Sequence, residues 1–153
     1  MNEWLLILGT LVLSGFFSGS EIAFVSANKL KLEVVSRRTN LVAKAIDFFK
    51  NRPETFLTTT LVGNNIVNVV YATLMAIFLA EPITQLYLDY FGELPSELMV
   101  LSLQTVLASI LIMIFGEILP KAIFRAQADY LVHFIALPLR ILHFALRPLI
   151  IIA

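Results

Sequence analysis

The chain has 153 residues, of which 59% are hydrophobic and 14% are charged, whereas an average soluble domain is about 45–50% apolar and about 25% charged. A globule of this size cannot bury so much apolar surface internally, so the composition predicts an integral membrane protein in contact with the lipid bilayer. The formal net charge is zero, which argues against nucleic-acid binding, and the lack of cysteine excludes disulfides, thiolate metal sites and cysteine nucleophiles.

Three apolar segments are each long enough to cross a membrane, and none of them contains lysine or arginine. They cover residues 4–27, 56–80 and 98–119. About 20 helical residues span a hydrocarbon core of about 30 Å, so each segment predicts one crossing. We therefore expect an all-α integral membrane protein, a single domain over residues 1–153 with three transmembrane helices.

A cleaved signal peptide is the competing interpretation of the first apolar segment. Signal peptides begin with a positively charged region. Here the residues before the apolar run include Glu3 and no cation, and the positive residues follow the run instead. We therefore expect this segment to remain in the protein as its first transmembrane helix.

The positive charges are segregated along the chain and predict its orientation. Seven of the eleven lysines and arginines lie in the connection 28–52, and the other four lie at or after Lys121. Cytoplasmic loops are enriched in these residues, so both regions are expected inside the cell, beneath the plasma or inner membrane. The connection 81–97 carries four acidic residues and no cation, which fits an external loop. The N-terminus is then external and the C-terminus cytoplasmic.

The connection 28–52 has the periodicity of one amphipathic helix lying on the inner membrane surface. Its apolar face would consist of Leu30, Val34, Leu41, Ala45 and Phe48. The adjoining polar arc would consist of Glu33, Ser36, Arg37, Asn40, Lys44 and Asp47.

Residues 125–151 form a second amphipathic segment, with a polar stripe about 80° wide on a helical wheel. The stripe consists of Arg125, Asp129, His133, Arg140, His143 and Arg147. Such a stripe is typical of a belt-like helix in the membrane interface, and Pro138 and Pro148 would kink it. The alternative is a fourth span whose arginines face a pore. Because the apolar pattern is still running at Ala153, we expect further chain beyond it.

Three clusters of polar residues lie within the predicted spans, where each polar group is costly and usually faces a partner or a cavity. Their sequences are SGFFSGSE at 14–21, GNNIVN at 63–68 and FGEILPK at 115–121. Close helix packing explains the first cluster taken alone, since Gly15 and Gly19 form a GxxxG pattern. Interhelical hydrogen bonding explains one asparagine of the second cluster, but three asparagines in five residues exceed that need.

The third cluster combines a carboxylate with a helix defect. In an α-helix Pro120 cannot donate to the carbonyl of Gly116, so that oxygen is freed, and the missing side chain of Gly116 lets another group approach. The competing interpretation is an ion pair between Glu117 and Lys121 that ends the helix at the interface. Together the three clusters offer hydroxyl, amide, carbonyl and carboxylate oxygens, a set that suits a hard cation such as Mg²⁺ or Ca²⁺.

These three motifs, in this order, resemble the transmembrane domain of the CorC/CNNM family of magnesium transporters. The resemblance covers essentially the whole chain. It implies a homodimer of subunits with three spans and a juxtamembrane belt, and magnesium export driven by sodium inflow, so Mg²⁺ and Na⁺ are the expected ions. In full-length members the belt leads to cytoplasmic CBS domains that bind ATP, and no CBS domain lies in this chain.

Carried over residue by residue, the resemblance implies a metal site formed by Ser18, Ser20, Asn64, Asn68, Gly116 and Glu117. Glu21 and Asn65 are weaker candidates, because Glu21 lies nearer the cytoplasmic end and Asn65 points to another helix face. A membrane module that senses Mg²⁺ without transporting it fits the same residues. An intramembrane enzyme does not, since both histidines lie in the belt segment and no HExxH or GxSxG pattern occurs.

Overall fold

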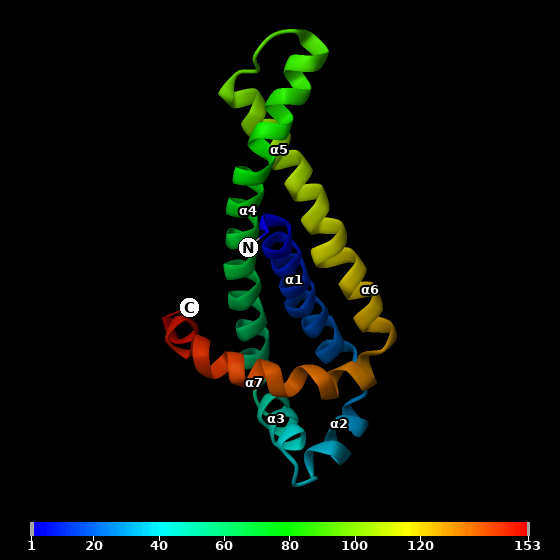
Figure 1. Ribbon diagram of the computed structural model, residues 1–153. Helices are drawn as coiled ribbons and strands as arrows, with labels where there is room; N and C mark the ends of the chain where they lie inside the picture. Colours follow the sequence, from blue (N-terminus) through cyan, green and yellow to red (C-terminus); the bar gives the residue numbers. More distant parts are fainter. Residues whose placement is uncertain (1, 153) are drawn as a thin grey trace.

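The computed structural model describes residues 2–152, and all regular secondary structure among them is helical. Three long helical segments form the body of the molecule, with α1 between the other two and in contact with both (Figure 1). The first is α1 (Glu3–Ser26) and the second is α4 (Pro53–Phe91). The third consists of α5 (Glu97–Leu111), the π-helical segment η1 (Ile112–Ile118) and α6 (Leu119–Ala126). The predicted all-α membrane fold is confirmed.

Helix α1 packs closely against its neighbours because its buried face is lined with small residues. A Cβ added to Gly15 would lie 2.8 Å from the Pro120 ring, and one added to Gly19 would lie 2.6 Å from the Phe124 ring. The GxxxG pattern therefore serves the close packing of α1 against α6. On the α4 side, the ring of Phe17 lies directly on Gly63.

Helix α4 is much longer than the predicted span. Its 39 residues extend about 58 Å at 1.5 Å per residue, roughly twice the hydrocarbon thickness. It continues through Pro82 and ends at Gly92, whose φ of 72° is left-handed. The expected loop 81–97 was therefore mostly wrong, because only residues 92–96 lie outside helices. The acidic residues of this segment indicate contact with water, but they do not distinguish a loop from a helix that extends beyond the membrane into water.

The connection between α1 and α4 forms two helices, which corrects the prediction of one. Helix α2 (Lys29–Ser36) and helix α3 (Leu41–Lys50) are separated by a turn, and Asn40 caps α3 by accepting from the Ala43 N–H at 2.7 Å. The turn divides the connection, so the predicted apolar face is only partly correct: Ala45 is buried and Phe48 is half-buried. Leu30, Val34 and Leu41 are exposed, whereas the buried residues are Leu32, Ala43, Ala45, Ile46 and Phe49.

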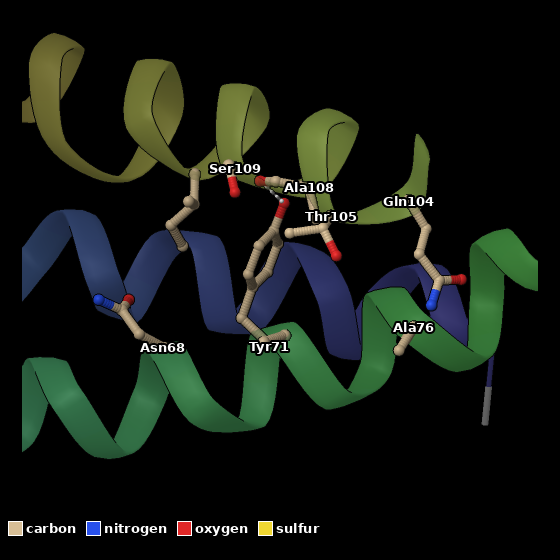
Figure 2. A pocket seen from close by; sticks show the side chains of 9 residues that line it. Asn68, Tyr71, Ala76, Gln104, Thr105, Ala108 and Ser109 are labelled. Carbon is tan, nitrogen blue, oxygen red and sulfur yellow. Dashed lines mark hydrogen bonds between the residues drawn. The ribbon is translucent and has the colours of Figure 1, made fainter. Parts of the chain in front are cut away.

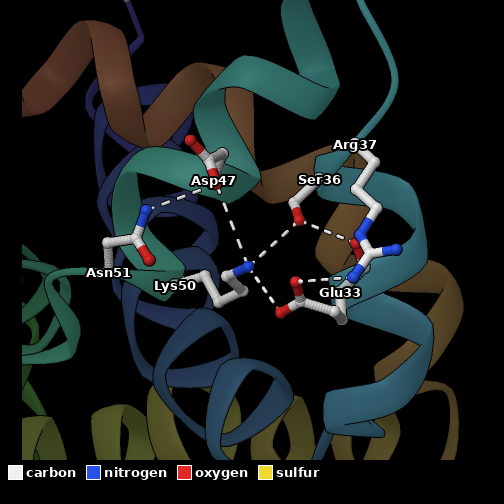
Figure 3. Close-up of polar contacts among 6 residues, drawn as sticks. All are labelled: Glu33, Ser36, Arg37, Asp47, Lys50 and Asn51. Carbon is white, nitrogen blue, oxygen red and sulfur yellow. Dashed lines mark hydrogen bonds and ion pairs between the residues drawn. The ribbon is translucent and has the colours of Figure 1, made fainter.

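Polar contacts join α2 to α3 (Figure 3). Lys50 Nζ lies 2.6 Å from Glu33 Oε2 and donates to Ser36 Oγ at 3.2 Å. The hydrogen bond and the positive charge of Lys50 lower the pKa of the Glu33 carboxyl. The α2–α3 hairpin is thus held by an ion pair as well as by its buried apolar residues.

Helix α7 (Ala128–Ile152) lies across the ends of the long helices rather than beside them, and it contacts α1, α3 and α4 (Figure 1). Val132, Ile135, Ala136 and Leu139 are its buried core residues. The helix continues through Pro138 and Pro148 without interruption. Within residues 2–152 four helical segments, α7 included, have the length and hydropathy of a membrane span, but only α7 has this crosswise placement.

The predicted polar stripe is divided in the structure. Arg125 belongs to α6 and is separated from α7 by a break at Gln127. Asp129 accepts from the Asn28 N–H at 2.7 Å and pairs with Lys31 at 3.2 Å. His133 bonds to a carbonyl of its own helix. Arg140, His143 and Arg147 line one cavity, whereas Arg125 and Asp129 line another.

Candidate ion-binding site

Oxygen atoms from α1 and α4 converge at Ser14. Its hydroxyl oxygen lies 3.1 Å from Asn64 Oδ1 and 3.0 Å from Asn68 Oδ1, and Ser14 is completely buried. The two asparagines are one helical turn apart and present their amide oxygens to the same point. A hydroxyl group has a single hydrogen to donate, so it satisfies only one of these two oxygens at a time.

The spacing of these oxygens matches the edge of a magnesium coordination shell. Neighbouring ligands of an octahedral Mg²⁺ ion at about 2.0–2.1 Å lie about 3 Å from one another. Hydrogen bonds between hydroxyl and carbonyl groups are usually shorter, about 2.7–2.8 Å. The Ser14 hydroxyl oxygen therefore lies from each amide oxygen at the spacing of two neighbouring metal ligands.

Gly116 of η1 closes the third side of this oxygen cluster. A Cβ added there would lie 2.9 Å from Ser14 Oγ and 3.1 Å from a side-chain carbon of Ile112. Only a residue without a side chain allows the backbone of η1 to come this close to the hydroxyl. The structure thus brings Ser14, Asn64, Asn68 and Gly116 together from three helical segments.

The helix around Gly116 is wound as a π-helix, a feature that sequence reasoning missed. The Leu119 N–H donates to the Ile114 carbonyl, five residues before it, and such π segments are frequent at functional sites. In a π-helix the N–H of residue 120 would bond to the carbonyl of Phe115, and in an α-helix to that of Gly116. Because proline has no N–H, the π-helical winding leaves the Phe115 carbonyl, and not the Gly116 carbonyl, without this donor. The helix therefore departs from α-helical winding over the seven residues Ile112–Ile118, and the freed carbonyl expected at Gly116 stays a prediction.

Glu117 follows Gly116 and is half-buried. Within residues 2–152 the four ion pairs involve Glu33, Asp47 and Asp129 as the acids, so Glu117 is not paired with Lys121 one turn later. The interpretation of Glu117 as a simple helix-ending ion pair is therefore wrong. It is the one carboxylate adjacent in sequence to the oxygen cluster.

The other candidates from the sequence lie outside the cluster. Ser18 is buried one turn beyond Ser14, and the Ser20 hydroxyl donates to the Phe16 carbonyl of its own helix at 2.5 Å. Glu21 and Asn65, the weaker candidates, are exposed. Ser14 belongs to the first polar cluster but is not among the expected metal ligands. Its position one helical turn before Ser18, on the same helix face, is the signal that could have identified it.

A cavity of about 180 Å³, lined by both polar and apolar side chains, lies beside Asn68, between α4 and α5 (Figure 2). Tyr71 crosses it and donates its hydroxyl to the Ala108 carbonyl at 2.9 Å. Gln104 lines the cavity, is 6% exposed, and its Oε1 has no hydrogen-bond partner. Sequence reasoning missed this cavity, although a glutamine in the middle of an apolar span is itself a signal of function.

Comparison with protein families assigns the domain. The family described as the cyclin M transmembrane N-terminal domain matches residues 5–153. The chain belongs to this CNNM family. Among curated relatives, a UPF0053 protein of Synechocystis is 31% identical over 135 residues, which covers 84% of this chain and 29% of that protein.

Two further relatives give the same family assignment. A UPF0053 protein of Haemophilus influenzae is 28% identical over 126 residues, 82% of this chain and 27% of that protein. The UPF0053 inner membrane protein YfjD of Escherichia coli is 26% identical over 133 residues, 85% of this chain and 28% of that protein. The CNNM domain described here thus spans less than a third of the length of these relatives.

Proposed function

We propose that this CNNM domain binds Mg²⁺ between its three long helical segments and carries it across the membrane. The observation that carries the proposal is the convergence of Ser14, Asn64 and Asn68 oxygens at about 3 Å spacing. Mg²⁺ requires about six oxygens in near-octahedral geometry. The three side chains, a carbonyl of η1 and the Glu117 carboxylate would supply most of them, so the bound ion would be largely dehydrated.

The charge of the proposed site suits an ion that must also leave. One carboxylate among neutral oxygens compensates half of the charge of a divalent cation, which favours binding without a deep trap. Ser18 and Ser20 stay in the proposal as ligands of a later stage, because both are buried on α1. The cavity at Gln104 and Asn68 would serve as the route between the site and the α4–α5 side.

We propose export as the direction of transport and sodium inflow as its driving force, following the family resemblance. Na⁺ is also bound by oxygen ligands, and the neutral oxygens beside Asn68 would suit a monovalent ion better than a divalent one. The functional unit would be a homodimer, with the N-terminus and the α4–α5 turn outside the cell, α2, α3 and α7 on the cytoplasmic side, and ATP-binding CBS domains after α7 in the full-length protein.

The second candidate function is Mg²⁺ sensing without transport. The complete burial of Ser14 favours it, because an ion held there would be enclosed by the helices. Such a module would change its helix packing when Mg²⁺ binds, and a partner would respond to that change.

Ion flux distinguishes the two functions. Sealed vesicles containing only this protein and a Mg²⁺-sensitive dye would be given an inward or outward Na⁺ gradient. Transport predicts Mg²⁺ movement that reverses with the gradient and is lost in Asn64→Leu but kept in Asn65→Leu. Mg²⁺ binding in calorimetry without any flux would assign the domain to sensing, and absence of both binding and flux would refute the ion site altogether.

A further inference from the structure

Positive side chains line a cavity far along the chain from the proposed ion site, where α7 meets the end of α3 and the start of α4. The cavity has a volume of about 590 Å³. Arg52, Arg140, His143 and Arg147 line it, and neither aspartate nor glutamate is among its lining residues.

No carboxylate of the described chain neutralises these arginines. The ion pairs within residues 2–152 use Lys31, Arg37 and Lys50 as their cations. Arg140 Nη1 is buried and has no hydrogen-bond partner. A partly desolvated cation without an anionic partner is costly, so an anion from outside the described helices would stabilise Arg140.

Aromatic and polar contacts hold the side chains of this cavity in position. The Arg140 guanidinium carbon lies 3.4 Å from the centre of the Phe48 ring, and that of Arg52 lies 4.6 Å from the same ring. His143 Nδ1 lies 3.1 Å from Thr59 Oγ1. Two guanidinium groups fixed against one ring form a preorganised anion site rather than a scatter of mobile surface charges.

The same cavity has an apolar side. Phe144, Ile150 and Ile151 line it, and 65% of Phe144 and 73% of Ile151 are exposed. A small inorganic anion would leave this apolar surface in contact with water. A molecule with a phosphate group and hydrocarbon chains would cover both parts.

We propose that this cavity binds an anionic phospholipid, with its phosphate on Arg52, Arg140 and Arg147 and its acyl chains along Phe144, Ile150 and Ile151. Guanidinium groups form bidentate, charge-assisted hydrogen bonds with phosphate oxygens. Basic pockets at the cytoplasmic ends of transmembrane helices are suited to such head groups. The bound lipid would fix α7 to α3 and α4, so this binding is separate from ion transport.

The test measures binding of short-chain phosphatidylglycerol to the detergent-solubilised protein by native mass spectrometry. The variant Arg52→Gln/Arg147→Gln removes two exposed cations of the cavity, and Arg38→Gln/Lys44→Gln removes two exposed cations elsewhere in the same region. We expect affinity at least ten-fold weaker in the cavity variant and near wild type in the control, with both retaining the wild-type circular dichroism spectrum. Should the double variant fail to fold, Arg147→Gln alone is compared with Arg38→Gln.

Competitors decide the chemistry of the ligand. Phosphatidylcholine, glycerol phosphate, inorganic phosphate and polyglutamate are each added to the protein loaded with phosphatidylglycerol. The proposal predicts that none displaces the lipid at equal concentration. Displacement by phosphate would assign the cavity to free anions, and displacement by polyglutamate would assign it to an acidic protein segment. Equal loss of binding in both charge variants would show non-specific attraction, and each of these three results overturns the proposal.

Discussion

The ring of Phe17 on α1 lies against the Cα of Gly63 on α4, in the space that any side chain at position 63 would occupy. Gly63→Val should therefore separate α1 from α4, since overpacking costs about 1–3 kcal/mol. The melting temperature in detergent should fall, and Mg²⁺ protection should weaken because Ser14 moves from Asn64. Gly9→Val is the control, because a Cβ there meets nothing within 4 Å. Equal melting temperatures for the two variants would contradict this packing.

The negative charge of Glu117 should contribute strongly to the affinity of the site for Mg²⁺. Glu117→Gln keeps the size of the side chain and removes its charge, so we expect Mg²⁺ affinity in calorimetry to fall by at least ten-fold. The exposed Glu21 provides a matched control on α1, and Glu21→Gln should bind Mg²⁺ as the wild type does. An unchanged affinity in Glu117→Gln would exclude this carboxylate from the site.

The neighbouring asparagines of α4 provide a sharp test of the oxygen cluster. Asn64 contacts the Ser14 hydroxyl, whereas Asn65 is exposed on another face. Asn64→Leu should abolish the stabilisation of the protein by Mg²⁺ against heating, because it removes a ligand and leaves Ser14 with one partner. Asn65→Leu should keep that stabilisation. If the two variants behave alike, the cluster is a packing contact and not a binding site.

Pro120→Ala tests the π-helical segment. The alanine restores a backbone donor, so η1 should rewind toward an α-helix and the carbonyls facing α1 should turn back into it. Thermal stability should hold or rise, since proline costs about 3 kcal/mol in a helix interior, while Mg²⁺ binding weakens. Normal melting together with undiminished Mg²⁺ protection would show that Pro120 only shapes the helix near Lys121.

The α2–α3 hairpin should lose stability in acid. The pKa of Glu33 is lowered in the folded protein below its ordinary value of 4.5, chiefly by Lys50. Its contribution to stability is therefore complete above that ordinary pKa and is lost as the pH falls through the lower, folded-state pKa. Lys50→Met should remove this pH dependence, and the exposed Lys44 offers Lys44→Met as the control. A melting profile against pH that is identical in both variants would refute the pair.

Sequence reasoning was reliable where one simple physical requirement acts on a whole segment. Lipid contact excludes cations over long stretches, so the three long helical segments were predictable from the absence of lysine and arginine. It failed where several signals compete. Asn40 resembled one more polar residue of a continuous helix, yet its side chain caps a new helix, so the connection does not present the single apolar face expected of one helix.

The candidate site was predictable in its chemistry and less so in its geometry. The asparagines and Gly116 could be recognised in the sequence, because polar residues are costly inside a membrane span and a glycine there is unusual. Which serine meets them depends on how far α1 is shifted along α4, and no local pattern fixes that shift. The π-helical winding was also beyond reach, because Gly116 and Pro120 are compatible with a simple α-helical end.

The contacts of Gly15 with Pro120 and of Gly19 with Phe124 share a four-residue repeat on two helices that run in the same direction. Each ring fits into the space that a glycine leaves on the surface of α1, and the next such space lies one helical turn away, about 5.4 Å. Beyond Gly19 the following position in the row is Ala23, which is small and fully buried. Sliding of α6 along α1 is therefore opposed for fractions of a turn and least opposed for a whole turn, so these two helices have discrete rather than continuous registers.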